Sequence, residues 1–220
     1  AANVSVVVNP LPTVACPANS SVCLNATAFA LTGGSPAGGT YSGPGVSAGN
    51  FDPAVAGAGT HTINYDYSDG NSCSNSCQFT ITVNPLPVVS CGSYGPVCAD
   101  AADIALVGSP AGGAWSGTGV TGNSFDPSAG TQTVTYSYTD GNGCSASCST
   151  IITVNPLPVV NCGGPYAPQC DNGSPLALNG SPSGGTWSGN GVDGDAFDPS
   201  LAGVGSWTLT YTYSDGNGCT

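Results

Sequence analysis

The chain has 220 residues, rich in Gly and Pro, and it contains neither Lys nor Arg. Its 12 acidic residues are all Asp, which gives a formal net charge of −12 with His neutral. Neutralising phosphate groups requires Lys or Arg, so this composition excludes nucleic acid as a partner and argues against binding to anionic membrane surfaces. No apolar run has the length that insertion into a membrane needs.

The motif Asn-Pro-Leu-Pro begins at Asn9, Asn84 and Asn155, at spacings of 75 and 71 residues. Residues 218–220 followed by 1–10 rebuild, one residue shorter, the segment found uncut at 143–156. The sequence therefore predicts three units of one repeat, cut inside a unit, either as a window of a longer array or as copies that complete one another. We assign the last strand of a preceding or neighbouring-copy unit plus a joint to 1–12, and the three repeats to 13–87, 88–158 and 159–220, the third without its last strand.

Within each repeat the same predicted elements follow one another. The Pro-Leu-Pro joint favours an extended, semi-rigid connector. A short strand comes next, at 29–31, 104–106 and 176–178, and a Gly-Ser-Pro turn leads from it to a strand with one aromatic residue. That aromatic residue is Tyr41, Trp115 or Trp187, and a Phe-Asp-Pro step follows it at Phe51, Phe125 and Phe197.

The last hairpin of each repeat has the clearest pattern. Apolar and polar residues alternate with the period of a strand in 62–67, and an Asp-Gly-Asn turn follows. The return strand places Phe79, Ile81 and Val83 on one face, and in the joined unit that place is taken by Val4, Val6 and Val8. No segment has the 3.6-residue period of a helix. We expect an all-β fold, a tandem array of three immunoglobulin-like antiparallel β-sandwich repeats with disulfides.

Eleven cysteines occupy matching places in the repeats: Cys16, Cys23, Cys73, Cys77, Cys91, Cys98, Cys144, Cys148, Cys162, Cys170 and Cys219. In small Gly- and Thr-rich β repeats this pattern predicts disulfides formed in an oxidising compartment. A zinc site is disfavoured, because the spacings are poor for ligands and the third repeat has only three Cys. Four cysteines allow three connectivities, among which the sequence does not choose.

Several motifs together resemble a known group of repeats: Cys-Pro-Ala-Asn (16–19), Gly-Thr-Tyr-Ser-Gly-Pro-Gly-Val (39–46), Phe-Asp-Pro (51–53), the Tyr-x-Tyr strand and Asp-Gly-Asn-Gly-Cys. They resemble the immunoglobulin-like, PKD- and HYR-like repeats in large secreted surface proteins of Bacteroidetes-type bacteria. The resemblance implies stalks, adhesins or surface fibres. It also implies the disulfides Cys16–Cys77 and Cys91–Cys148, which leaves Cys23–Cys73 and Cys98–Cys144. In the third repeat Ala2 takes the place of the last-strand Cys, so Cys219 would bond either Cys162 or Cys170, leaving one thiol unpaired or paired elsewhere.

Catalysis finds little support in the residue types. The chain has one His and no Glu, Lys or Arg, so the usual general bases and oxyanion-stabilising cations are missing. His61 is replaced by Gln132 and Trp207 at the matching strand position, which indicates a variable strand-end residue. We expect that the protein is not an enzyme and has no catalytic residues.

Three candidate binding features have ordinary structural explanations beside the functional ones. Asp193, Asp195 and Asp198 are weak Ca²⁺ candidates, but Asp before Gly or Pro is common turn chemistry, so we expect no metal or cofactor and consider Ca²⁺ unlikely. The aromatic residue of each repeat would stack on a sugar if exposed, although a core position is the commoner case. Trp207 is the better candidate for an exposed aromatic residue. Five Asn-x-Ser/Thr sequons predict covalent glycans on a charge-poor surface: Asn3, Asn19, Asn25, Asn172 and Asn179.

Taken together, these features predict an extracellular structural repeat protein at the cell surface or in a secreted fibre. It would form a thin surface fibre or adhesin stalk, with units joined head to tail by a continuous chain or by donor-strand complementation. Its main partner would be itself, with surface glycans as further partners. The alternative is a carbohydrate-binding or calcium-dependent adhesive module of a secreted multidomain protein.

Overall fold

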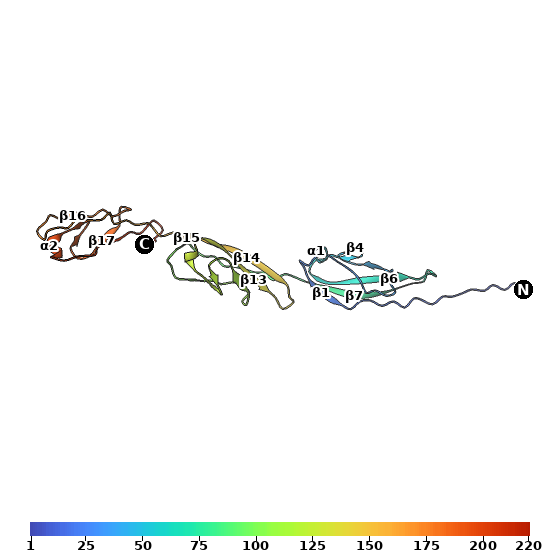
Figure 1. Cartoon of the computed structure of the whole chain (residues 1–220). Coiled ribbons are helices and arrows are strands. Elements are labelled where there is room, and N and C mark those ends of the chain that lie inside the picture. Colours follow the sequence, from blue (N-terminus) through green and yellow to red (C-terminus); the bar gives the residue numbers. More distant parts are fainter. The chain divides into compact units, whose positions relative to one another are not determined.

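The computed structural model describes all 220 residues, which form two compact units. Unit 1 contains Ala1–Ser90, Ser109–Gly113 and Ser137–Cys148, and unit 2 contains Cys91–Gly108, Ala114–Tyr136 and Ser149–Thr220. Most regular structure is β, and Figure 1 colours it along the chain. The helices are single turns, α1 (Pro53–Ala56), η1 (Pro127–Ala129) and α2 (Pro199–Ala202), and no helix is long and apolar enough to cross a membrane.

Repeat 1 forms two sheets in unit 1. The larger has the order β1-β7-β6-β3, with β1 (Ser20–Cys23), β7 (Ser74–Asn84), β6 (Gly59–Ser68) and β3 (Thr40–Ser42). The smaller has the order β2-β5-β4, with β2 (Phe29–Ala30), β5 (Asn50–Phe51) and β4 (Val46–Ser47). β6 and β7 run side by side and antiparallel, with Ile63 opposite Phe79 and Gly59 opposite Val83 (Figure 1).

One pairing differs from the expected antiparallel order. β1 lies parallel to β7, with Ser20 opposite Ile81 and Cys23 opposite Asn84. Two contacts fix this direction, because Cys16 is bonded to Cys77 and the Asn19 side chain accepts a hydrogen bond from the Thr80 amide at 2.8 Å. The chain that leaves Cys16 therefore advances along β7 in the same direction as β7 itself.

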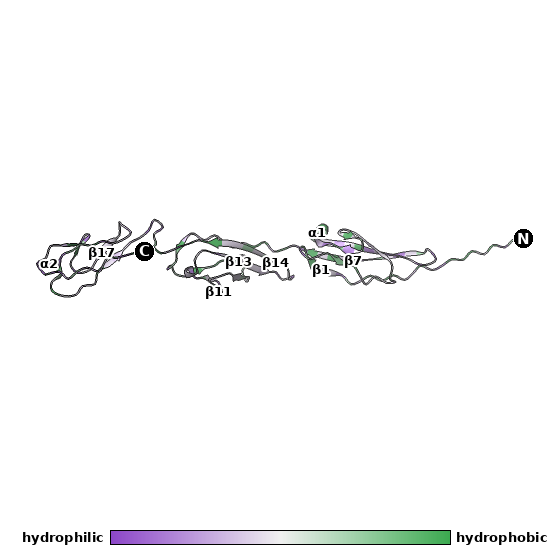
Figure 2. Cartoon of the chain, turned by 45° about the horizontal axis from the view of Figure 1, so that its top comes forward, coloured by the Kyte–Doolittle hydropathy of each residue, from purple (hydrophilic) through white to green (hydrophobic).

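The core of repeat 1 combines residues of both sheets. Phe51 of β5 packs with Ile63 of β6 and with Phe79, Ile81 and Val83 of β7, and all five are at most 5% exposed. The last strand contributes every second residue from Phe79 to Val83 to this core. Figure 2 shows the chain coloured by hydropathy. Fully burying one such side chain stabilises a fold by about 1.5–3 kcal/mol, so β7 supplies a large share of this small core.

The same elements recur after residue 90. Repeat 2 has the sheets β9-β12-β11 and β10-β13-β14 and the parallel pair β8–β15: β8 (Val97–Cys98), β9 (Ile104–Ala105), β10 (Ala114–Ser116), β11 (Val120–Thr121), β12 (Ser124–Phe125), β13 (Gln132–Thr139), β14 (Ser145–Ile152) and β15 (Val154–Asn155). Repeat 3 has β16-β19-β18 and β17-β20: β16 (Leu176–Ala177), β17 (Thr186–Ser188), β18 (Val192–Asp193), β19 (Ala196–Phe197) and β20 (Thr210–Thr212). Repeat 3 contains no counterpart of β7.

The Phe-Asp-Pro step is a helix start in every repeat. The carboxylate of Asp52 accepts the Ala54 amide at 2.9 Å, Asp126 accepts Ser128 at 2.8 Å, and Asp198 accepts Ser200 at 2.9 Å. Hydrogen bonds from Ser128 and Ser200 lower the pKa of Asp126 and Asp198 respectively. Three of the twelve acidic residues are therefore N-caps of the single helical turns, with Pro at the first helical position.

The Gly-Ser-Pro turn is held by a tyrosine of the hairpin. The Tyr65 hydroxyl donates to the Pro36 carbonyl and accepts the Gly39 amide at 2.9 Å, and its ring passes directly under Gly34. A Cβ on Gly34 would lie 2.5 Å from that ring, so the position requires Gly. Tyr211 makes the same two bonds, to Pro182 and Gly185, in repeat 3.

Candidate functional site

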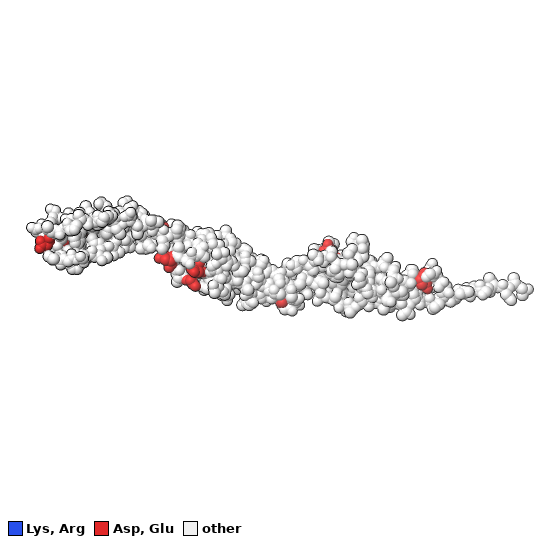
Figure 3. Space-filling model, in the orientation of Figure 1, with Lys and Arg blue, Asp and Glu red and all other residues white.

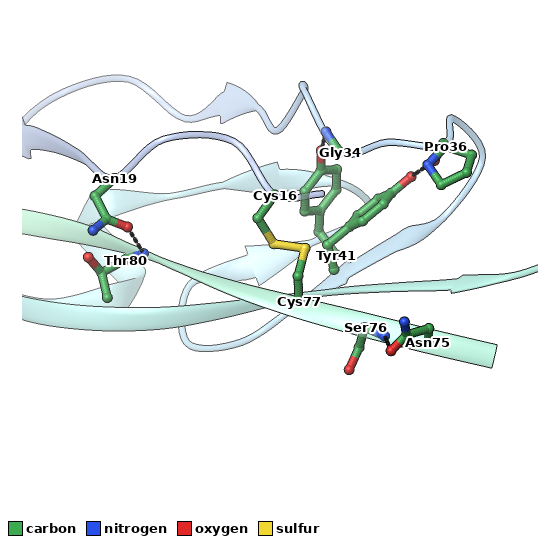
Figure 4. Close-up of a disulfide and its surroundings, with 10 residues drawn as sticks. Cys16, Asn19, Gly34, Pro36, Tyr41, Asn75, Ser76, Cys77 and Thr80 are labelled. Carbon is green, nitrogen blue, oxygen red and sulfur yellow. Dashed lines mark hydrogen bonds between the residues drawn. A yellow bond between two sulfur atoms is a disulfide. The ribbon is translucent and has the colours of Figure 1, made fainter. Parts of the chain in front are cut away.

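The first disulfide ties the start of repeat 1 to its last strand. Cys16 bonds Cys77, with the two Cα atoms 5.8 Å apart, which is the pairing that the resemblance implied. Figure 4 shows this bond above β7, with the hydrogen bond between Asn19 and Thr80 beside it. Cys91 and Cys148, the matching residues of repeat 2, are also disulfide-bonded. These cysteines therefore staple a strand to the small core that it completes.

The predicted Cys23–Cys73 bond is wrong. Cys23 lies opposite Asn84 at the end of β7, whereas Cys73 precedes Ser74 at its beginning. The 11 residues of β7 separate the two positions by about 35 Å, but a disulfide needs its Cα atoms within about 7 Å. Cys23 instead bonds Cys144 of the next repeat, with Cα atoms 5.5 Å apart.

The predicted Cys98–Cys144 bond fails for the same reason. The expectation that Cys219 bonds Cys162 or Cys170 is also wrong, because Cys219 bonds Cys98 and the other two are free. Cys98 lies opposite Asn155, at the far end of the last strand from Cys144. It bonds Cys219 of the third repeat, again with Cα atoms 5.5 Å apart. Both bonds between repeats join residues 121 positions apart, so they repeat the same offset.

The Asp-Gly-Asn turn presents the hairpin cysteine to the neighbouring repeat. The carboxylate of Asp140 accepts the Cys144 amide and that of Asp215 accepts the Cys219 amide, each at 2.9 Å. This hydrogen bond from the Cys219 backbone is the main cause of the lowered pKa of Asp215. Cys144 and Cys219 are 0% and 1% exposed, so the turn holds each thiol position firmly in a buried junction.

Three cysteines are free: Cys73 is half-buried, and Cys162 and Cys170 are exposed. Cys73 is held by the same turn as its counterparts, since the Asp69 carboxylate accepts its amide at 2.9 Å. Cys170 is followed by the same turn as Cys23, with a bond from the Gly173 amide to the Cys170 carbonyl at 2.9 Å. Each of these two thiols thus occupies the place of a residue that elsewhere joins two repeats.

Repeat 3 has an open groove where the other repeats have their last strand. The groove has a volume of about 600 Å³, and its apolar lining includes Leu176, Leu178, Trp187, Phe197, Trp207 and Leu209. Phe197 is only half-buried, whereas its counterparts Phe51 and Phe125 are 0% exposed. β20 covers three residues and β6 ten, because β20 has no partner on its outer side.

The segment predicted to act as an inter-unit strand lies unpaired in unit 1. Val4, Val6 and Val8 are 89%, 79% and 88% exposed, and residues 1–12 form no strand. Such a run of exposed β-branched residues is unusual for a soluble surface. It matches the alternation of Phe79, Ile81 and Val83 in β7.

The aromatic candidates divide between core and surface. Trp115 and Trp187 are 8% and 9% exposed, and the Trp187 ring lies 5.1 Å from that of Tyr211, so these two are core residues. Tyr41 is half-buried and its hydroxyl accepts the Gly34 amide at 2.8 Å, as Figure 4 shows. Trp207 is 44% exposed and lines the groove.

His61 has a structural partner. Its Nε2 donates to the Gly57 carbonyl at 2.9 Å, and the residues at the matching position do likewise, Gln132 to Ala129 at 2.9 Å and Trp207 to Gly203 at 3.1 Å. Three chemically different side chains thus close the same loop after the helical turn. Each donor reaches back to a carbonyl at the end of the helical turn, that of the C-cap Gly57 or Gly203 in two repeats and that of Ala129, just before Gly130, in the other.

The remaining candidates lie on the surface. Asp193 and Asp195 are exposed, while Asp198 caps α2, and no group of three or more His, Cys, Asp or Glu side chains is placed to hold a metal. Acidic side chains occupy small separate groups on the face seen in Figure 3, with no Lys or Arg beside them. All five sequon asparagines are exposed: Asn3, Asn19, Asn25, Asn172 and Asn179.

Comparison with known proteins finds likeness in structure but not in sequence. No family model and no curated protein matches the chain. A solved structure described as a Ca²⁺-stabilized adhesin that helps an Antarctic bacterium reach out and bind ice is similar, with 14% identity and a TM-score of 0.35, over 95% of this chain and 71% of that one. The expectation of no cofactor, with Ca²⁺ unlikely, is contradicted by this finding, because the similar adhesin is Ca²⁺-stabilized, and we no longer hold it.

Proposed function

We propose that this chain is an extracellular structural repeat protein that forms a thin surface fibre or adhesin stalk. Its repeats would be immunoglobulin-like β-sandwiches joined head to tail, by a continuous chain or by donor-strand complementation. The observation that carries the proposal is the pair of bonds Cys23–Cys144 and Cys98–Cys219, each of which joins one repeat to the next with the same offset of 121 residues. Four disulfides are typical of extracellular proteins.

The size of the repeats favours such covalent junctions. A unit of 71–75 residues has a small core and generally needs disulfides or neighbours for stability. Without Lys or Arg, the junctions between repeats lack the usual ion pairs. Disulfides between repeats supply both stability and continuity, and these are the properties that a load-bearing stalk requires.

The residue types do not favour an enzyme. The one His is committed to a backbone carbonyl, and half of the carboxylates are bonded to backbone amides of their own turns: Asp52, Asp69, Asp126, Asp140, Asp198 and Asp215. We therefore propose a mechanical role in which the array itself is the partner of each unit.

An adhesive module is the second candidate, and one observation favours it. Trp207 exposes 44% of its surface at the groove of repeat 3, where a sugar ring would find an aromatic face. Calcium-dependent adhesion belongs to the same candidate, since the similar solved structure is described as a Ca²⁺-stabilized adhesin. Binding of the intact protein to a glycan array, with and without Ca²⁺, distinguishes this role from a purely structural one.

The direct test of the fibre is electron microscopy of the native material. Three sandwiches with strands of about 8 residues at roughly 3.3 Å per residue, plus loops, give an axial repeat on the order of 100 Å. We expect thin filaments with that period, and mass spectrometry of the filaments should return this sequence. Discrete short particles carrying the sequence would refute the fibre and favour the adhesive module.

A further inference from the structure

We propose that the groove of repeat 3 binds residues 4–8 of a second copy of this chain as its missing last strand, and that Cys170 then forms a disulfide with Cys73 of that copy. The inference rests on the proposed fibre and specifies how one copy would join the next. It assigns a partner to the groove, to the exposed valines and to two of the three free thiols. Each of these features stands on its own in the structure.

The lining of the groove matches the surface on which β7 packs in repeat 1. Phe51 and Ile63 are buried there against Phe79, Ile81 and Val83, and Phe29 packs on the same cluster. Their counterparts in repeat 3 by sequence are Phe197, Leu209 and Leu176, and all three line the groove and are only half-buried. The groove therefore has the chemistry of a site for one strand with an apolar residue at every second position.

Residues 4–8 have that alternation, and the landmark behind them sets the register. Asn9-Pro-Leu-Pro matches Asn84-Pro-Leu-Pro, so Val4, Val6 and Val8 correspond to Phe79, Ile81 and Val83. In repeat 1 these last residues lie opposite Ile63, His61 and Gly59. The equivalent pairing sets Val4 opposite Leu209, Val6 opposite Trp207 and Val8 opposite Gly205.

The second edge of the inserted strand gives the same register. Cys23 lies opposite Asn84 in the parallel pair of repeat 1, and Cys98 lies opposite Asn155 in that of repeat 2. Cys170 is the counterpart of both, so Asn9 of the incoming copy would lie opposite it. The Pro-Leu-Pro joint would then lead the incoming chain away from the groove and into its own first repeat.

The two thiols are held in the geometry of existing junctions. After Cys23 and Cys98 the amide three residues on bonds back to the cysteine carbonyl at 3.0 Å, and after Cys170 it does so at 2.9 Å. The hydrogen bond from the Cys73 amide to the Asp69 carboxylate is as long as the matching hydrogen bonds from the Cys144 and Cys219 amides, 2.9 Å in each case. Cys170 and Cys73 are therefore the two halves of a third junction, continuing the series Cys23–Cys144 and Cys98–Cys219.

Bond formation is an ordinary two-electron oxidation. The Cys170 and Cys73 Sγ atoms each lose a proton, one S–S bond forms, and two electrons reduce a small-molecule disulfide, such as oxidised glutathione, to two thiols. Cys162 remains reduced, because its counterpart Cys16 bonds Cys77 and the residue in the place of Cys77 on the incoming strand is Ala2. Each joined copy thus keeps one free thiol out of the three in the separate chain.

The test uses the chain of 220 residues, purified with its disulfides intact and incubated with reduced and oxidised glutathione. We expect a ladder of covalent multimers on non-reducing gels, a decrease from three titratable thiols per chain in denaturant toward one, and a Cys73–Cys170 peptide by mass spectrometry. Since the chain lacks Lys and Arg, cleavage needs pepsin or chymotrypsin. Trp207 emission should shift to the blue as Val6 covers its ring.

Matched variants distinguish the contribution of the inserted strand to assembly from that of the disulfide. Val6→Asp should abolish assembly, whereas Val7→Asp, on the opposite face of the strand, should leave it intact. Cys170→Ser or Cys73→Ser should remove the covalent ladder but keep non-covalent multimers, and Cys162→Ser should behave as the parent chain. All of these positions are exposed or half-buried, and circular dichroism checks that each variant folds.

A chain that stays monomeric with three thiols, or a ladder linked through Cys162, would overturn the proposal. If native filaments are nevertheless seen by electron microscopy, the fibre function stands and only this junction is wrong. If no native filament exists, the proposed function fails whatever the purified chain does.

Discussion

The disulfides set how far this chain can be stretched, and removing one of them should change that length by a predictable amount. We consider pulling on Ala1 and Thr220 under non-reducing conditions until all non-covalent structure is lost. Two covalent paths of nearly equal length then remain, and both use Cys98–Cys219. One enters through Cys16–Cys77, and the other enters through Cys23–Cys144 and the disulfide-bonded Cys148 and Cys91. The first path extends residues 1–16, 77–98 and 219–220, and the second extends 1–23, 144–148, 91–98 and 219–220. Either path is about 40 residues or about 140 Å at ~3.5 Å each.

The double variant Cys98→Ala, Cys219→Ala removes both paths, since each needs the Cys98–Cys219 bond. The shortest path now uses Cys23–Cys144 and extends residues 1–23 and 144–220, which is about 100 residues or about 350 Å. The double variant Cys23→Ala, Cys144→Ala is the matched control, because it removes a bond of the same span but leaves the path of about 140 Å through Cys16–Cys77 and Cys98–Cys219. The two variants lose bonds of the same type but should differ by about 210 Å in final length.

Single-molecule force spectroscopy with handles at both ends measures this contour length directly. The parent chain and the control should agree, and reduction with dithiothreitol should bring all three to the full length of 220 residues, about 770 Å. A control as long as the Cys98→Ala, Cys219→Ala variant would show that the bonds do not connect the repeats in this order. Equal lengths of about 350 Å in all three oxidised proteins would refute the offset pairing altogether.

Three further predictions concern the repeats themselves. Gly34→Ala should lower the free energy of unfolding of unit 1, measured in urea, by about 1–3 kcal/mol, because its Cβ would lie 2.5 Å from the buried Tyr65 ring. Gly70→Ala, whose Cβ would have nothing within 4 Å, should match the parent. Equal losses in the two variants would contradict the packing argument. Hydrogen bonds from Ser200 lower the pKa of Asp198, so the stability that Asp198 gives to α2 is present above the ordinary pKa of 3.8 and is lost as the pH falls through the lower folded pKa. The NMR shift of the Ser200 amide should therefore titrate with a midpoint below pH 3.8. A midpoint at or above 3.8 would count against the cap. Ca²⁺ at fixed ionic strength should raise the melting temperature of a chain with 12 carboxylates and no Lys or Arg, reversibly with EDTA, and an unchanged melting temperature would remove the case for calcium.

Much of the fold could be predicted because its signals are local. The alternation in 62–67 falls inside β6, and the Asp-Gly-Asn turn joins β6 to β7 as expected. The Phe-Asp-Pro step is visible as a motif, although its role as a helix cap depends on backbone angles that only the structure gives. The parallel edge strand β1 was missed, since four residues with two serines carry no directional signal.

The pairing of the cysteines could not be predicted in full, because it depends on where strand ends lie. Cys16–Cys77 was implied by the resemblance, but the sequence offers several partners for Cys23 and Cys73 and does not choose among them. What decides between them is the length of β7, which places Cys23 at one end of a strand of 11 residues and Cys73 at the other. A prediction of strand length to within two residues, together with the parallel register of β1, would have excluded the bond within the repeat.

The same length explains why the junctions belong to the fold. A strand about 35 Å long cannot have its two end cysteines bonded to each other, so each must either stay free or reach a neighbouring repeat. One of the two cysteines lies at the hairpin tip, where an Asp carboxylate accepts its amide hydrogen bond. The other lies on the strand that pairs with the end of the last strand, beside the Pro-Leu-Pro joint. In Cys23–Cys144 and Cys98–Cys219 the hairpin tip of one repeat therefore meets the strand beside the Pro-Leu-Pro joint of the repeat before it.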